Sequence, residues 1–525
     1  MDSTDRITTR LSPKQRWTLV MSCLAVALVI ASMAALYTAL PEIAGRTGAT
    51  QQQLTWIVDS YTLALACLVL PAGALGDRYG RRAVLIFGLL LFSVASATPL
   101  LLDGPAWLIG ARAAAGAGAA LVMPSTLSLL TAGFPPARRG NAVGIWAGVA
   151  GAGAVLGIVG SGLLLERWSW LSVFVAMTVA GVALLIAGFT IPESIDDQRP
   201  AMDPWGATTV MLAVGLIVVG AIEAPVRGWL DPVVISTFAC GVAGAVTFVF
   251  IELRVEHPLL DVRLFAGRGF GSGTASVTVQ FLVTFGVFML LVQYLQLILG
   301  YRPLTSALAM APMVVPLMAI SMVAPWLAER FGLRIPTFVG LMVLGIGLLA
   351  MARLDLDSTY LDLLWPLLVM SAGLGLCTAP ATAAIIAGTP VEKHGVAAAV
   401  NDAAREVGAA IGIAIAGSIL AAGYSSRIAP ALPRLPEQTR GPVADSLAAA
   451  LQITERAGPQ AAPLADFAKA AFIHGAQQAS LALGFIAVAA AVLVAAWAPG
   501  NRRHLTRPDA GAVHAGRTRS DSPIG

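Results

Sequence analysis

Long runs of hydrophobic residues, separated by short polar clusters, dominate the sequence. A helix that crosses the hydrocarbon core of a bilayer needs about 20 mostly apolar residues. Fourteen runs are close to that length or exceed it, at 17–40, 54–75, 84–102, 107–131, 140–165, 171–192, 205–225, 232–252, 270–299, 305–328, 334–352, 361–389, 395–422 and 473–498. The pattern therefore predicts fourteen transmembrane helices in an all-α integral membrane protein.

Composition agrees with a membrane protein. Of the 525 residues, 57% are hydrophobic and 12% are charged, whereas soluble chains carry roughly 25% charged residues. The net charge of +4 arises from clusters between apolar runs, which is typical of membrane proteins, so we expect no nucleic-acid partner. All four cysteines lie within apolar runs, and we expect neither a disulfide nor a metal site. The sequence contains no phosphate-binding loop and no nucleophile motif, which disfavours an ATP-driven pump and an enzyme.

Arginines gather in alternate loops and set the expected orientation. Basic clusters at 78–82, 138–139, 330–334 and 502–503 each follow an even-numbered run. Because cytoplasmic loops carry the excess of Lys and Arg, both termini are predicted to be cytoplasmic and the chain to lie in the inner or plasma membrane. The long loop at 423–472 is then external, and its Ala- and Pro-rich sequence predicts a short helical or disordered flap.

A ten-residue pattern occurs twice in the chain. Asp77, Arg78, Gly80 and Arg82 after the second run match the acid, Arg, Gly and Arg of residues 329–334 after the tenth. Repeated halves with a substrate path between them are typical of secondary transporters. The predicted organisation is a cytoplasmic tail (1–16), a six-helix bundle (17–192), a linker with the inserted seventh and eighth helices (193–252), a second six-helix bundle (253–498) and a disordered cytoplasmic tail (499–525).

Three carboxylates stand well inside predicted spans, namely Asp59, Asp402 and Glu406. A charge at the bilayer centre costs about 2.5–3.5 kcal/mol even on a lenient scale, and an apolar environment favours the neutral, protonated acid. Asp402 and Glu406 are four residues apart and share one helix face, so they can share a proton. Arg405 lies on the same helix, which leaves a structural ion pair as the alternative for at least one acid.

The decapeptide at 73–82 resembles the loop signature of the major facilitator superfamily, through Gly73, Asp77, Arg78, Gly80, Arg81 and Arg82. In that family this loop acts as a cytoplasmic latch between conformations. The alternative, which is compatible with a latch, is that the arginines only set topology. Residues 54–61, 258–265 and 293–303 are similar to signatures of the fourteen-helix drug:proton antiporters, and among these to the quaternary-ammonium pumps. The resemblance implies a major facilitator fold of two six-helix bundles plus two inserted helices.

Further site residues follow from this resemblance. Asp59, Asp402 and Glu406 fall on acidic positions of the quaternary-ammonium pumps, and Arg112 resembles the fourth-helix arginine that the family links to proton transfer. A structural arginine is the alternative for Arg112. The fifth span looks like the antiporter motif, with Gly153, Gly157 and Gly162 at its core and Ile158 in place of the family's proline. Ordinary close packing of small residues is the alternative there.

The chain also departs from the family pattern. Ser32 and Tyr37 replace the acid and the asparagine of the first-helix motif, and Leu317 stands where the quaternary-ammonium pumps carry an acid. Fewer carboxylates imply a lower capacity for dicationic substrates. Aromatic and amide side chains are predicted to line an apolar cavity that holds a cation against ring faces: Tyr37, Trp56, Tyr61, Phe281, Phe285, Phe288, Tyr294, Gln280 and Gln293.

Together, these features predict a proton-coupled multidrug exporter that works by alternating access. Its expected partners are protons, membrane lipids and lipophilic, often cationic small molecules, and it is expected to act as a monomer, without a cofactor. The alternative is a dedicated exporter of an endogenous natural product, which a gene neighbourhood with biosynthetic enzymes would favour. A membrane enzyme or receptor is disfavoured, because the sequence offers neither a catalytic motif nor a large soluble domain.

Overall fold

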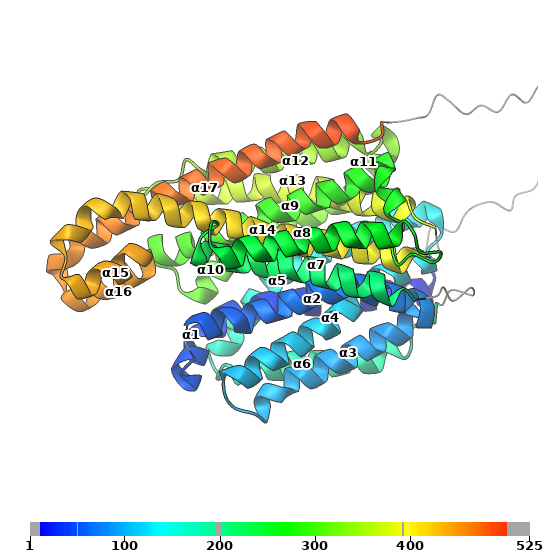
Figure 1. Ribbon diagram of the computed structural model, residues 1–525, viewed down its shortest axis with the longest axis horizontal. Coiled ribbons are helices and arrows are strands. Elements are labelled where there is room, and N and C mark those ends of the chain that lie inside the picture. Colours follow the sequence, from blue (N-terminus) through cyan, green and yellow to red (C-terminus); the bar gives the residue numbers. More distant parts are fainter. Residues whose placement is uncertain (1–10, 50, 195–201, 391–392, 501–525) are drawn as a thin grey trace, which may run out of the picture.

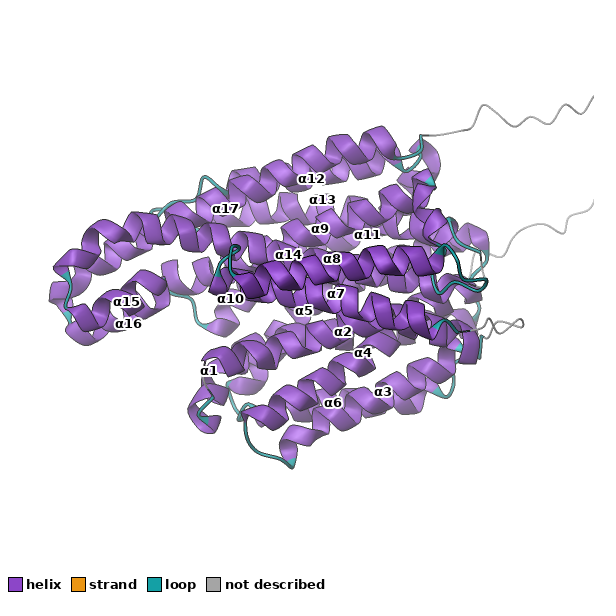
Figure 2. Ribbon diagram, in the orientation of Figure 1, coloured by secondary structure: helices purple, strands orange, loops and turns teal. Residues whose placement is uncertain are grey.

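The computed structural model describes residues 11–49, 51–194, 202–390 and 393–500. These residues form helices joined by short loops, and the only β-pairing among them is one isolated bridge between Gly332 and Gly500, as Figure 2 shows. The α-helices are α1 (Pro13–Thr47), α2 (Gln51–Tyr79), α3 (Arg81–Ala97), α4 (Pro105–Gly133), α5 (Pro136–Leu165), α6 (Leu171–Gly188), α7 (Pro204–Arg227), α8 (Pro232–Glu252), α9 (Arg268–Gln293), α10 (Pro303–Met310), α11 (Val314–Phe331), α12 (Arg334–Met351), α13 (Tyr360–Ala387), α14 (His394–Ile428), α15 (Glu437–Asp445), α16 (Leu447–Ala457) and α17 (Ala462–Trp497).

Within the described part of the chain, 14 helical segments are long and apolar enough to cross a membrane. The predicted number of spans and the all-α class are therefore confirmed. The tenth span differs from expectation because a 3₁₀ turn at Ala311–Met313 divides it into α10 and α11. Pro312 lies in this turn, and proline cannot donate the backbone hydrogen bond that a continuous helix requires.

The first helix begins at Pro13, earlier than the expected start at residue 17. Ser12 caps it, because its hydroxyl accepts from the backbone N–H of Gln15 while the Gln15 side chain accepts from the N–H of Ser12. This reciprocal capping box satisfies two backbone donors of the first turn. The remainder of the predicted N-terminal tail, and the C-terminal tail beyond Gly500, lie outside the described residues.

Helices of each half pack mainly on one another. In the first half α1 packs on α5, and α4 packs on α2 and α3; in the second half α9 packs on α14, and α12 packs on α13 and α17. The halves meet where α14 contacts α2 and α4 and where α5 contacts α11. Helices α7 and α8 pair with each other, and α7 contacts both α2 and α14, so this pair lies along the junction of the two halves (Figure 1).

The segment at 423–472 is largely helical. Helix α14 continues to Ile428 and α17 already begins at Ala462, and the short helices α15 and α16 form a hairpin between them. The hydroxyl of Tyr424 donates to the carbonyl of Val443 at 2.9 Å, which ties the hairpin to α14. Of the two forms expected for this segment, the structure has the helical one, and it projects at one end of the molecule (Figure 1).

Candidate transport site between the two bundles

A cavity of about 330 Å³ lies between the halves, bounded by α1, α5, α9, α10, α14 and the π-helical turn Tyr294–Ile298. π-Helical turns occur frequently at functional sites. The wall is mainly apolar, with a few polar groups, which is the usual character of a small-molecule site. Its polar members are Tyr37, Thr38, Gln293, Gln296 and Ser306, and its larger apolar members include Met33, Ile158, Phe285, Phe288 and Met289.

The residues predicted to line a cavity are distributed over several places. Tyr37, Phe285, Phe288 and Gln293 line the cavity between the halves. Trp56 is part-buried on α2, outside this lining. The predicted lining is therefore only partly brought together in this conformation.

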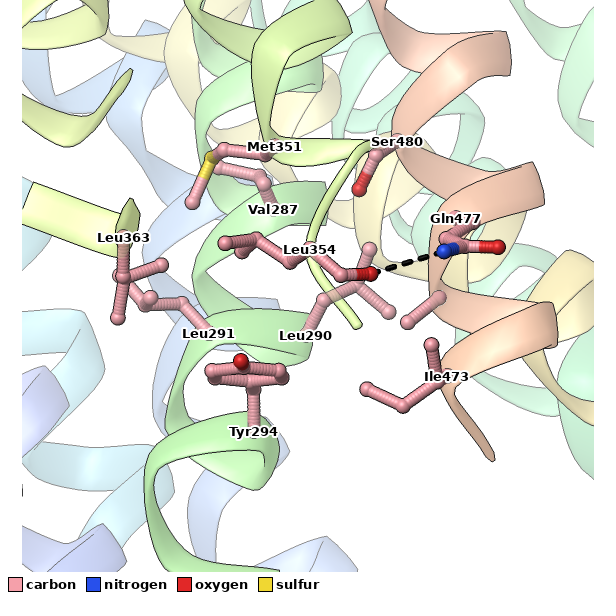
Figure 3. A pocket seen from close by; sticks show the side chains of 11 residues that line it. Val287, Leu290, Leu291, Tyr294, Met351, Leu354, Leu363, Ile473, Gln477 and Ser480 are labelled. Carbon is pink, nitrogen blue, oxygen red and sulfur yellow. Dashed lines mark hydrogen bonds between the residues drawn. The ribbon is translucent and has the colours of Figure 1, made fainter. Parts of the chain in front are cut away.

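Gln280 and Tyr294 serve other contacts. The Gln280 amide donates to Ser276 and accepts from Thr378, both at 2.7 Å, inside the second bundle. The Tyr294 ring lines a separate cavity of about 30 Å³ beside α12, α13 and α17, and its hydroxyl donates to the Asp355 carbonyl at 3.3 Å. Figure 3 shows Tyr294 in this second cavity, whose walls are mostly aliphatic.

Asp402 and Glu406 lie buried on α14, with 0% and 7% of their surface exposed. Oδ1 of Asp402 is 3.7 Å from the Arg405 guanidinium and accepts a hydrogen bond from the Asn401 amide at 3.2 Å. Oδ2 of Asp402 and Oε2 of Glu406 have no hydrogen-bond partner among the described residues. Asp402 therefore has a nearby cation. Each of the two acids also keeps an oxygen that has no hydrogen-bond partner among the described residues and can bind a proton.

A polar chain continues from this cluster into α13. Thr382 donates to the Asn401 side-chain carbonyl at 2.9 Å, so Asn401 links α13 to Asp402. Neither Asn401 nor Thr382 is among the site residues predicted from the sequence. The available signal was an amide directly before an intramembrane acid, because a buried amide needs partners of its own.

Arg405 lies between two aromatic rings and is itself only 4% exposed. Its guanidinium carbon is 4.5 Å from the ring centre of Phe281 on α9 and 5.6 Å from that of Trp146 on α5. The ring of Phe281 stacks on Phe285 at 5.8 Å, and Phe285 contacts Phe288 at 5.9 Å. An aromatic ladder thus connects the arginine to the wall of the cavity.

Arg112 occupies the interior of the first bundle. Its guanidinium donates to the Ser32 hydroxyl at 3.0 Å, to the Ser32 carbonyl at 3.3 Å and to the Ile57 carbonyl at 3.4 Å. The ring of Tyr61 lies 4.2 Å from the guanidinium, and the Tyr61 hydroxyl donates to the Val29 carbonyl at 2.8 Å. Tyr61, a predicted cavity residue, instead packs on this arginine, and Ser32 fills the position of the missing acid.

Asp59 lies on α2, apart from the cluster on α14. Glu223 of α7 is close enough to Asp59 to interact with it electrostatically, and Glu223 also pairs with Arg227 at 2.6 Å. Glu223 is not among the predicted site residues, because it stands at the end of a predicted span, where acids are less costly. The acid–Arg spacing of four residues on one helix was the available signal.

The predicted latch residues join the two halves. Asp77 pairs with Arg81 at 2.9 Å and accepts hydrogen bonds from the backbone N–H groups of Gly395 and Val396, at 2.9 and 3.1 Å. These donors form the first turn of α14, where a carboxylate is favoured by the helix dipole and by the unpaired N–H groups. A side chain at Gly73 would collide with the Gly395 carbonyl, so glycine permits this contact.

The rest of the loop is fixed by the segment that follows α6. Arg82 pairs with Glu193 at 3.4 Å and donates to the Ile191 carbonyl at 3.0 Å. Gly80 has a φ of 105°, which favours glycine and produces the sharp turn between α2 and α3. The guanidinium carbon of Arg78 lies 5.5 Å from the centre of the Tyr79 ring.

The second copy of the repeat makes a related contact. Gly140, in the first turn of α5, faces Pro325 and Glu329 at the end of α11. Glu329 thus lies near the N-terminal part of α5 in the opposite half. Gly332, the counterpart of Gly80, also has a positive φ, of 77°. The two copies therefore correspond in structure as well as in sequence.

The glycines of the fifth span bring α5 against its neighbours. A side chain at Gly157 would collide with the Ala31 carbonyl of α1, and one at Gly153 would lie 3.0 Å from Ile30. Gly162 faces Leu304 of α10. Leu317, at the position of the second missing acid, packs on Gly151. These contacts are those of close helix packing.

A membrane protein of repeated helical halves, with a cavity between them and buried acids on one of the helices that bound it, has the architecture of a secondary transporter. Comparison with protein families agrees, because residues 22–413 match the Major Facilitator Superfamily. The chain therefore belongs to the Major Facilitator Superfamily, as the loop signature at 73–82 predicted.

Similar proteins include drug-resistance transporters. The multidrug efflux pump LfrA of Mycolicibacterium smegmatis is 33% identical over 93% of this chain and 97% of its own length. The multidrug resistance protein Stp of Mycobacterium tuberculosis is 32% identical over 80% of this chain and 78% of its own. The crystal structure of the human organic anion transporter MFSD10 covers 92% of this chain and all of its own with a TM-score of 0.62 and 13% identity, which supports the fold.

Proposed function

We propose that this protein exports lipophilic, often cationic compounds in exchange for protons. The observation that carries the proposal is the similarity, over nearly the full length of both chains, to a multidrug efflux pump. The cavity between the halves supports it, because its apolar wall and few polar groups suit hydrophobic compounds of varied shape. The alternative of a dedicated natural-product exporter is not favoured by relatives whose names describe multidrug resistance.

The proposed mechanism is alternating access. Asp77 and the first turn of α14 join the halves at the end where the described chain begins and stops. The cavity is lined in part by α10, which lies toward the end that carries the α15–α16 hairpin (Figure 1). The positive-inside rule assigns the first end to the cytoplasm. This conformation is then closed toward the cytoplasm and has its cavity toward the outside. Release of the Asp77 contacts accompanies the opposite state.

Proton coupling is assigned to the buried carboxyl groups. Asp402 and Glu406 lie on α14, which also contributes Ile413 to the cavity wall, and Asp59 is the third candidate. A carboxyl group that binds either a proton or a substrate cation, but not both, couples the two flows by competition. The driving force is the proton gradient across the inner or plasma membrane, without a cofactor, and the functional unit is a monomer with both termini in the cytoplasm.

Proteoliposomes test this function. Vesicles that contain the purified full-length protein are loaded with buffer of one pH and diluted into buffer of a different pH. Ethidium transport is then followed by fluorescence. We expect transport only with a proton gradient, loss of coupling in Asp402→Asn and Glu406→Gln, and weakened coupling in Asp59→Asn. Glu455→Gln, on exposed α16, is the matched control. Gradient-independent transport, or unchanged coupling in the double variant of Asp402 and Glu406, contradicts the proposal.

A further inference from the structure

Arg405 is a buried cation that makes no hydrogen bond to a described residue. Its Nε has no partner among them, and its nearest carboxylate oxygen, on Asp402, is 3.7 Å away, beyond hydrogen-bonding distance. Guanidinium groups carry five donors, and a buried donor without a partner is costly. The side chain is thus enclosed without being tightly held.

The surroundings of Arg405 have the chemistry of a site for organic cations. Two ring faces, from Phe281 and Trp146, lie on the guanidinium, and Asp402 and Glu406 both act on its charge. Aromatic faces together with carboxylates are the groups that recognise ammonium and related cations. With one guanidinium and two carboxylates, this enclosure retains an excess of negative charge when both acids are ionised.

The Trp146 ring is held by its own half and does not depend on Arg405 for its position. The indole N–H of Trp146 donates to Thr126 at 3.1 Å, which fixes the ring from the first bundle. Phe281 is the member of the aromatic ladder that does not line the cavity, and it stacks on Phe285, which does. A flat cation that enters between the halves therefore meets a continuous aromatic surface that ends at Arg405.

We propose that Arg405 is a tethered cation that occupies the subsite for the positive group of a substrate. A substrate cation displaces the guanidinium from between the rings, and a neutral substrate leaves it there. Arg405 is accordingly a specificity-determining residue: it lowers the affinity for cations relative to neutral compounds of the same shape. The inference rests on the proposed export function and names the charge class of its cargo.

The position of the rings links this exchange to the transport cycle. Trp146 belongs to α5 of the first half, whereas Phe281 and Arg405 belong to α9 and α14 of the second. Separation of the halves at the cytoplasmic end removes the Trp146 ring from the guanidinium. Arg405 is then held by one ring and by the carboxylates, and the subsite opens to a cation from the cytoplasm. Closure with the guanidinium in place ejects that cation.

Binding to a pair of ligands that differ in charge tests the inference. Tetraphenylphosphonium is a cation, and triphenylphosphine oxide is a neutral compound of similar shape. Their dissociation constants are measured by calorimetry with the full-length protein in lipid nanodiscs. We expect Arg405→Gln to bind the cation about tenfold more tightly and the neutral compound with unchanged affinity. Arg405→Lys, which keeps a positive charge, is expected to resemble the native protein.

Two further variants separate this effect from a change in net charge or in folding. Arg427→Gln removes an exposed arginine from the same helix and is expected to change neither affinity. Asp402→Asn combined with Arg405→Gln is expected to cancel most of the gain for the cation. Equal shifts for both ligands, or the same gain in Arg405→Lys as in Arg405→Gln, overturn the inference. A native protein that binds both ligands but transports neither contradicts the proposed function instead.

Discussion

Each half of the molecule buries one arginine in its membrane interior, and the two are held in opposite ways. Arg112 in the first half donates to two carbonyl groups and a hydroxyl and stacks on Tyr61. Arg405 in the second half makes no hydrogen bond to a described residue, and rings and nearby acids surround it. The difference teaches that a buried cation can be a fixed structural element or a replaceable occupant, depending on its partners.

This contrast assigns different tasks to the halves. The hydrogen-bond partners of Arg112 are carbonyl and hydroxyl groups, which carry no charge, and its part in proton transfer stays a prediction. The partners of Arg405 are carboxyl groups, whose charge disappears on protonation. In the proposed mechanism, exchange between proton, guanidinium and substrate therefore takes place on α14, and Asp59 on α2 is a separate candidate for proton binding. The first half supplies the fixed ring of Trp146 and, through Asp77, the latch on the N-terminal turn of α14.

The largest expected effect is on the free energy of unfolding, and it distinguishes the positions of the two missing acids when an acid is restored at each of them separately. Leu317 is 2% exposed and packs on Gly151 and Gly375, which bring no positive charge. Leu317→Asp loses apolar burial and adds an acid without a cation, so we expect the free energy of unfolding to fall by about 4 kcal/mol or more. Thermal unfolding of the detergent-solubilised protein measures this loss.

Ser32→Asp is the matched control for that substitution, because Ser32 already accepts from the guanidinium of Arg112. A carboxylate there forms a charge-assisted hydrogen bond. We expect a folded protein and greater resistance of cells to a dicationic compound such as methyl viologen. If Leu317→Asp is tolerated as well as Ser32→Asp, the distinction between a site with a prepared cation and one without is wrong.

The two buried arginines are expected to differ in their contribution to the free energy of unfolding. Arg112→Gln removes the hydrogen bonds to Ser32 and the stacking on Tyr61, and we expect a loss of about 3 kcal/mol in the free energy of unfolding. Arg405→Gln removes no hydrogen bond to a described residue, and Asp402 and Glu406 can take up protons when the cation is gone, so we expect a loss of about 1 kcal/mol.

Thermal unfolding of both variants in the same detergent checks this order. Arg427→Gln serves again as the control, because that arginine is exposed on α14. Equal destabilisation by Arg112→Gln and Arg405→Gln would show that Arg405 is as firmly built into the second half as Arg112 is into the first. That outcome would remove the basis for treating Arg405 as a replaceable occupant.

The sequence predicted the class of fold well, because membrane helices are defined by local properties. The length of apolar runs predicted the number of spans, and the repeated acid–Arg–Gly–Arg pattern predicted two corresponding loops, which follow α2 and α11 in the structure. The division at Ala311–Met313 was not foreseen, since Pro312 lies in a run that is long and apolar enough to read as one span.

The acids of the candidate site could be predicted from the sequence, whereas the contacts around Arg405 could be predicted much less well. Asp59, Asp402 and Glu406 are conspicuous in sequence, because charges within apolar runs are costly. The contact between Trp146 and Arg405 joins residues from different halves, and neither hydropathy nor local spacing contains that pairing. Tyr61 shows the same limit: an aromatic residue predicted for the substrate cavity packs on Arg112 in this conformation.

The smallest expected effect concerns the ring that the first half contributes to Arg405. Trp146→Phe keeps an aromatic face but loses the hydrogen bond to Thr126, and we expect a loss of about 1 kcal/mol in the free energy of unfolding. Trp326→Phe is the control, because Trp326 is 54% exposed and lies 5.8 Å from Arg330 at the surface. Exposed contacts of this kind contribute little, so we expect no measurable change.

A double-mutant cycle shows whether the Trp146 ring acts through Arg405. If the ring stabilises the guanidinium, the loss caused by Trp146→Phe shrinks by about 0.5 kcal/mol when Arg405→Gln is already present. The residual loss then belongs to the hydrogen bond with Thr126, which does not depend on the arginine. Strict additivity of Trp146→Phe and Arg405→Gln would mean that the ring is only packing for the first half, and the guanidinium would then be bound by the second half alone.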